Sequence, residues 1–88
     1  MFKAVKVHNH ETPASTVEAA FNRIGSPFTA KELEKALIEA GVPVVVPEKT
    51  NSFRRTPCAM RVADRTIQRL RKAEKIEFNE DRQWVKKI

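Results

Sequence analysis

Residues 56–78, TPCAMRVADRTIQRLRKAEKIEF, decide the fold, and except for the last two residues they are typical of one helix. Thr56 suits the N-cap, and Pro57 suits the first helical position, where its missing N–H costs nothing. At 100° per residue, the side chains that we expect to face the core fall within one arc: Ala59, Met60, Ala63, Thr66, Ile67 and Leu70. The opposite side is a polar, cationic stripe, interrupted only by Asp64 on its flank, which we expect to be solvent-facing and unobstructed: Arg61, Arg65, Gln68, Arg69 and Lys72.

The positive charge of the chain is concentrated around this predicted helix. The 88 residues carry a formal net charge of +6. Residues 49–75 hold nine basic residues against Asp64 and Glu74, a net charge of +7, whereas residues 29–48 hold two basic residues against four acidic ones. A charge that only keeps a protein soluble is expected to be scattered, so this concentration indicates a surface for a polyanion.

Two helices are predicted before this segment. Ser15 followed by Glu18 forms the pattern of a capping box, with Thr12 and Pro13 as an alternative start one turn earlier, and Gly25 ends the first helix. Residues 1–14 before it are either a short strand or a flexible arm.

The second helix has the same signals at its ends. Thr29 is the predicted N-cap with Glu32 three residues on, and Gly41 follows the last turn. Ile38 is predicted to point away from the core, because it lies about 140° from Leu33 around the helix.

The remaining segments are predicted to be irregular or extended. Residues 41–56 have no helical period, and two prolines bracket a short valine run, so we predict a long inserted loop. After residue 75, Ile76 and Phe78 begin a terminal β-hairpin with a turn at residues 79–82, and Trp84 on its return strand is expected to close the core.

The order of these parts resembles the winged helix-turn-helix domain. The resemblance covers roughly residues 15–88, and it is carried by SPFTAKELEKAL and RTIQRLRKAEKIEFNEDRQWVKK. In the second stretch, Leu70, Ala73 and Ile76 match the pattern Leu-x-x-Ala-Gly-x-Ile that precedes the wing. Glu74 stands where the glycine usually is, so the helix either runs on slightly or closes in a strained turn. A connection of sixteen residues between the second and third helices also departs from the family, which uses only a few.

The resemblance implies a single α+β, mostly helical domain over residues 1–88. It has three helices, a recognition helix at 57–74, a C-terminal β-hairpin wing at 76–87 and the inserted loop at 41–56. The implied function is binding of duplex DNA, as a transcriptional regulator or a phage-like accessory factor of bacterial type, with the third helix in the major groove.

The side chains of the stripe are predicted to contact different parts of DNA. Arg61 and Arg65 are predicted to reach guanine O6 and N7, Gln68 an adenine edge or a phosphate, and Arg69 and Lys72 the backbone. Further contacts to phosphate are predicted from the inserted loop and the wing: Lys49, Arg54, Arg55, Arg82, Lys86 and Lys87. The acidic residues of the wing oppose its lysines and arginine, so we expect its contribution to be small.

Two other partners stay open at this point. The same basic face suits RNA, and a module of this fold also binds proteins, for which the inserted loop and Ile38 are candidates. Symmetric dimers are common among such DNA-binding domains, so a homodimer is an alternative to the monomer, although no heptad repeat supplies a seam.

Other classes of function are not expected. There is no glycine-rich phosphate loop, no carboxylate pair placed for acid–base work and no nucleophile with a nearby histidine, so we predict that the chain is not an enzyme. His8 and His10 lack a third ligand apart from Glu11, so we predict no metal and no cofactor. Cys58 near the start of a basic helix is expected to favour its thiolate. No stretch approaches the ~18 apolar residues of a membrane span, and the N-terminus lacks a signal-peptide pattern, so we expect a cytoplasmic protein.

Overall fold

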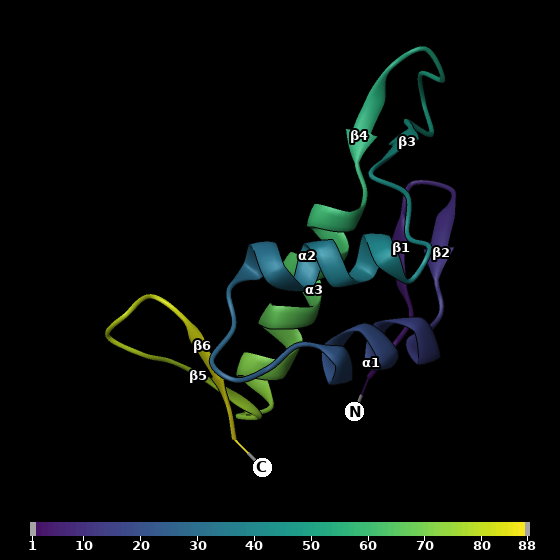
Figure 1. Cartoon of the computed structure of the whole chain (residues 1–88). Helices are drawn as coiled ribbons and strands as arrows, with labels where there is room; N and C mark the ends of the chain where they lie inside the picture. Colours follow the sequence, from purple (N-terminus) through teal and green to yellow (C-terminus); the bar gives the residue numbers. More distant parts are fainter. Residues whose placement is uncertain (1, 88) are drawn as a thin grey trace.

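Three helices and three antiparallel β-hairpins make up the computed structural model, which describes residues 2–87 (Figure 1). The elements in chain order are β1 Val5–Val7, β2 His10–Thr12, α1 Ala14–Arg23, α2 Ala30–Glu39, β3 Val45–Pro47, β4 Arg55–Pro57, α3 Ala59–Lys72, β5 Ile76–Phe78 and β6 Trp84–Lys86. The predicted α+β class, the three helices and the terminal hairpin are confirmed. None of the helices within residues 2–87 is long and apolar enough to cross a membrane.

Helix α1 begins without the predicted capping box. Its N-cap position is Pro13, no side chain caps it, and Ser15 lies inside the first turn. The backbone N–H of Thr16 donates to the Pro13 carbonyl at 3.1 Å. Thr12 cannot serve as the cap, because it pairs with Val5 in the β1–β2 hairpin and its side chain is buried. The start near Pro13 is therefore the one that the chain uses, but the prediction that Ser15 and Glu18 cap the helix is wrong.

Helix α2 has both predicted ends. The backbone N–H of Glu32 donates to Thr29 Oγ1 at 3.2 Å, and the N–H of Thr29 donates back to Glu32 Oε1 at 3.1 Å. At the other end, Gly41 has φ +103°, and the N–H of Val42 donates to the Leu37 carbonyl at 3.0 Å. Glycine suits this left-handed position because it has no Cβ atom.

The segment predicted as a long loop contains a β-hairpin. Strands β3 and β4 pair antiparallel, with Val46 opposite Thr56, and the hairpin extends from the end of the molecule where α3 begins (Figure 1). Prolines at positions 47 and 57 are compatible with pairing, since each strand of a two-stranded sheet has a free edge that needs no donor. The loop prediction is wrong because it counted only local signals, whereas burial of Val46 and Thr56 favours the paired form.

Helix α3 starts later than predicted. Thr56 and Pro57 belong to β4, and the N-cap position is Cys58, whose side chain makes no capping hydrogen bond. The first N–H groups are satisfied instead by the preceding segment, since Cys58 donates to the Val44 carbonyl at 2.8 Å and Ala59 donates to the Pro43 carbonyl at 3.1 Å. The predicted cap at Thr56 is therefore wrong, because main-chain carbonyls from across the hairpin base replace it.

The far end of α3 closes in the strained turn that we expected as one of two outcomes. Glu74 has φ +57°, and the N–H of Lys75 donates to the Leu70 carbonyl at 2.8 Å. This is the same closure that Gly41 makes after α2, here with a residue that carries a Cβ atom.

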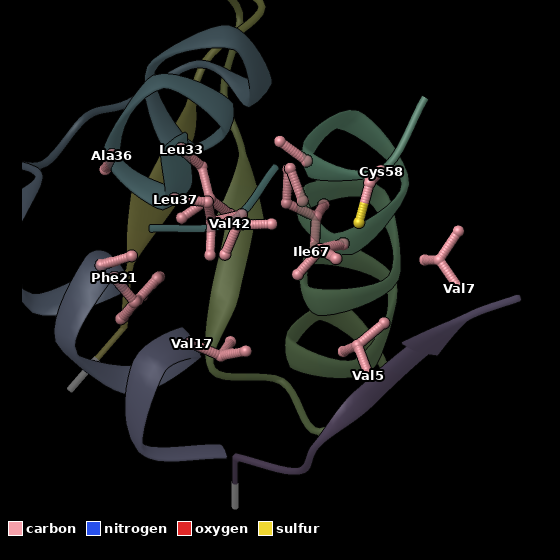
Figure 2. Close-up of a cluster of buried hydrophobic side chains, with 14 of the residues drawn as sticks. Val5, Val7, Val17, Phe21, Leu33, Ala36, Leu37, Val42, Cys58 and Ile67 are labelled. Atoms are coloured by element: carbon pink, nitrogen blue, oxygen red, sulfur yellow. The ribbon is translucent and has the colours of Figure 1, made fainter. Parts of the chain in front are cut away.

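The hydrophobic core lies between the three helices and β1 (Figure 2). Figure 2 shows Val5 and Val7 beside α3, on the side away from α2. Val62 lies on the same flank of α3 as Arg69, which donates to the segment leading into β1, and Val62 is fully buried, while Met60 is 44% exposed. The predicted inward arc of α3 is therefore wrong at Met60 and missed Val62.

The C-terminal hairpin is attached to the segment before α2. Phe28 and Trp84 exchange two backbone hydrogen bonds, of 2.8 and 2.7 Å. Trp84 is partly buried and packs against the core, which confirms its expected role. The predicted turn is also confirmed, with Asn79 Oδ1 accepting from the N–H of Asp81 and of Gln83. These contacts fix the hairpin relative to α2 and α3.

Candidate nucleic-acid interface

The outer face of α3 presents a group of polar and cationic side chains. Arg61, Gln68 and Lys72 are all exposed and fall within about 40° of one another at 100° per residue. They lie opposite the buried positions of the helix. Helix α3 holds these side chains in place because its other face is packed into the core, so this part of the predicted stripe lies together on one rigid element.

Arg65 and Arg69 lie on the flank of α3 and contact the N-terminal segment. Nη1 of Arg65 donates to the Lys6 carbonyl at 3.2 Å. Nη1 of Arg69 donates to the Ala4 carbonyl at 3.1 Å and to the Lys3 carbonyl at 3.4 Å. Both side chains remain exposed, and each guanidinium keeps further N–H groups. The expected single unobstructed stripe is therefore wrong in this respect: two of its five members also anchor residues 3–6.

No carboxylate of residues 2–87 lies within 4.0 Å of a cationic group on α3. Within residues 2–87, one ion pair falls within 4.0 Å, and it joins Arg54 Nε to Glu48 Oε2 at 3.9 Å. An exposed pair of this length contributes little. The glutamates of α2 thus form no ion pair with α3, and the β3–β4 hairpin leaves Arg61, Gln68 and Lys72 exposed; Asp64 is the exposed carboxylate of α3 itself.

The β3–β4 hairpin carries the other predicted cations. Lys49, Arg54 and Arg55 are exposed, and they extend the basic surface beyond the start of α3. The hairpin is also braced, because the N–H of Lys49 donates to Nδ1 of His8 in the β1–β2 turn at 3.1 Å. Phe53 at its tip is 97% exposed and was not among the predicted contact residues.

The wing offers fewer cations than predicted. Arg82 is exposed at the turn, beside the exposed carboxylates of Glu80 and Asp81. Lys86 was predicted to contact phosphate, but its Nζ already donates to two carbonyls at the end of α1, those of Phe21 at 2.8 Å and Ile24 at 2.7 Å.

Lys86 therefore has a structural role. Its ammonium lies 4.3 Å from the centroid of the Phe21 ring, and burial lowers its pKa. The residues next to Lys86 in the sequence could not predict this role, since more than sixty residues separate Lys86 from the carbonyls that accept from it.

Cys58 is not the activated thiol that we expected. Its side chain is fully buried, and burial raises the pKa of the thiol. The N-terminal position on α3 does not offset this, because the side chain belongs to the buried hydrophobic cluster (Figure 2). Within the described residues, no group of three metal-ligating side chains comes together, at His8 and His10 or elsewhere.

Comparisons with known protein families, curated proteins and solved structures found no match to this chain. The candidate site is thus defined by its own residues: a basic helix face between two hairpins of a small α+β protein.

Proposed function

We propose that this protein binds duplex DNA, as a winged helix-turn-helix domain whose helix α3 enters the major groove. The observation that carries the proposal is the outer face of α3, where Arg61, Gln68 and Lys72 are exposed, adjacent and without a carboxylate partner. A groove about 12 Å wide admits a helix, and guanidinium and amide groups match the edges of guanine and adenine.

The surrounding contacts support roles for the other cations. Arg65 and Arg69 already donate to main-chain oxygens, so they suit contacts to phosphate from the flank better than contacts to bases. The C-terminal hairpin is attached to the segment before α2 through the backbone hydrogen bonds between Phe28 and Trp84, which supports a phosphate contact by Arg82 at its turn. The biological role that fits best is transcriptional regulation or a phage-like accessory function.

Salt dependence of binding tests the proposal. A labelled random-sequence duplex is titrated with the protein at several salt concentrations, and affinity is read from fluorescence anisotropy. The logarithm of affinity should fall linearly with that of the salt concentration, with a slope of about 0.9 for each phosphate contacted. Lys72→Ala should weaken binding to every sequence and lower the slope by about one contact.

Lys35→Ala is the matched control, because Lys35 is an exposed lysine on α2 and the change removes the same charge. Equal losses in the two variants would mean that net charge, rather than α3, attracts DNA. Absence of salt-dependent binding would refute the proposal, and a structured RNA that outcompetes duplex DNA of equal length would replace it with RNA binding.

Base reading is tested separately by selecting bound sequences from a random duplex pool. Arg61→Ala should relax the preference at one base pair, a loss of about 1–3 kcal/mol of discrimination there, while Lys72→Ala should leave the selected sequence unchanged. An identical selected sequence for the wild type and Arg61→Ala would exclude Arg61 from base reading.

A further inference from the structure

The tip of the β3–β4 hairpin presents an aromatic ring that the fold does not use. Phe53 is 97% exposed, although phenylalanine is among the side chains that gain most from burial. Single exposed apolar residues are common on protein surfaces, so exposure alone indicates nothing. The surroundings of Phe53 are what make it informative.

The backbone around Phe53 is held by hydrogen bonds. The N–H of Phe53 donates to Asn51 Oδ1 at 3.1 Å, and the N–H of Arg54 donates to the Asn51 carbonyl at 3.0 Å. Below the turn, the N–H of Glu48 donates to the Arg54 carbonyl at 3.0 Å. The tip is therefore organised before any partner arrives, which lowers the entropic cost of using the ring in binding.

The hairpin that carries Phe53 is cationic. Lys49, Arg54 and Arg55 are exposed on the same hairpin, and Glu48 is its one carboxylate. An apolar wedge flanked by arginine and lysine is the combination with which minor-groove binders separate base steps while neutralising phosphates. Charge complementarity favours DNA over a protein surface as the occupant of this tip.

The hairpin and the wing lie towards opposite ends of the molecule, with α3 between them (Figure 1). The chain measures 40 Å along its longest axis. Neighbouring major and minor grooves on one side of B-DNA are centred about half a helical turn apart, or roughly 17 Å. Four residues separate Phe53 from Pro57 at the base of β4, which is about 13 Å of extended strand, so the hairpin extends from the start of α3 over a distance comparable to this spacing.

We propose that the β3–β4 hairpin is a second DNA contact, in which Phe53 inserts between base pairs from the minor groove while Lys49, Arg54 and Arg55 hold the flanking phosphates. This inference rests on the proposed function, because it takes the duplex at α3 as given. It assigns the inserted segment the role of a wedge that anchors and locally unstacks the duplex.

The experiment compares Phe53→Ala with the wild type in the same anisotropy titration. Phe53→Ala should weaken binding about tenfold or more, since stacking on a base contributes that much. The slope against salt should not change, because no charge is lost, whereas Arg54→Ala should lower it by about one contact. The melting temperature of Phe53→Ala should match the wild type, because the ring contributes no burial.

Val44→Ala is the matched control, since it shortens another exposed apolar side chain at the base of the same hairpin. Phe53→Trp should keep the affinity, and the emission of the introduced indole should be quenched on binding because it stacks on bases.

Affinity of Phe53→Ala within twofold of the wild type, or an introduced indole that stays unquenched, would overturn the inference. If Lys72→Ala still weakens binding in that case, the proposed function stands without the wedge. If the wild type binds no duplex at all, both proposals fail together.

Discussion

Glu74 closes helix α3 in a conformation that favours glycine. Its φ of +57° lies in the left-handed region, and the N–H groups of Glu74 and Lys75 donate to the carbonyls of Arg71 and Leu70 at 3.0 and 2.8 Å. These hydrogen bonds keep the helix end in place in spite of the Cβ atom. Replacing Glu74 by glycine should therefore stabilise the protein.

The magnitude follows from two opposing terms. A left-handed conformation costs a residue with a Cβ atom about 1–2 kcal/mol. Replacement by glycine removes this cost but destabilises the folded state by about 0.5–1 kcal/mol, because glycine makes the unfolded chain more flexible. The free energy of unfolding of Glu74→Gly should thus rise by about 0.5–1 kcal/mol. For a domain of this size, the melting temperature should rise by roughly 2–8 °C.

The assay is thermal unfolding followed by circular dichroism, with two controls. Glu74→Gln removes the charge, which is unfavourable at the C-terminal end of a helix, but keeps the Cβ atom, so it isolates the electrostatic part. Gly41→Ala should lose about 1 kcal/mol or more of stability, because φ is +103° there. An added Cβ atom would meet no other atom within 4 Å, so this loss reports backbone strain alone. A melting temperature for Glu74→Gly at or below that of Glu74→Gln would refute the reasoning about strain.

Three further predictions concern capping and burial. Thr29→Ala should lower the free energy of unfolding by about 1 kcal/mol in urea denaturation, whereas Ser15→Ala should change it little, because Thr29 caps α2 and Ser15 does not cap α1; equal effects would contradict this. Lys86→Met should cost about 1 kcal/mol or more through the loss of two hydrogen bonds to carbonyls of α1, and the exposed Lys87→Met serves as its control in the same assay. Cys58 should react with a thiol reagent at pH 8 only when urea unfolds the protein, and because burial raises the pKa of this thiol, its contribution to stability is present below pH 9.0 and is lost at more alkaline pH. Rapid labelling of the native protein would contradict the burial of Cys58.

Features fixed by neighbouring residues could be predicted from the sequence. The capping box of Thr29 and Glu32 and the turn after Gly41 each depend on residues a few positions apart, and both are confirmed. The exposed position of Ile38 on α2 is confirmed for the same reason, since helical periodicity alone determines it.

Features that depend on distant segments could not be predicted. Met60 is exposed although it was predicted to face the core, and Val62 is buried although the predicted arc did not include it; β1, more than fifty residues earlier in the chain, packs against α3. Thr56 is a residue type that often caps helices, but here it pairs with Val46 and lies in strand β4.

The candidate site divides in the same way. Periodicity predicted that Arg61, Gln68 and Lys72 share a face, and they do. Periodicity could not predict that Arg65 and Arg69 donate to the N-terminal segment. Every residue has a carbonyl oxygen, so the sequence does not show which of them will accept a hydrogen bond. The roles of all five in binding DNA stay predictions.

The acceptors used by Arg65 and Arg69 are main-chain oxygens, which every amino acid supplies. We therefore expect residues 3, 4 and 6 to tolerate replacement of their side chains without loss of these anchors. Trimming the polypeptide past residue 6 has a different effect, because it removes all three acceptors in one step. Two guanidinium groups would then lose their main-chain partners, and the same cut would remove the fully buried Val5, so the side of α3 that β1 covers would be exposed to solvent.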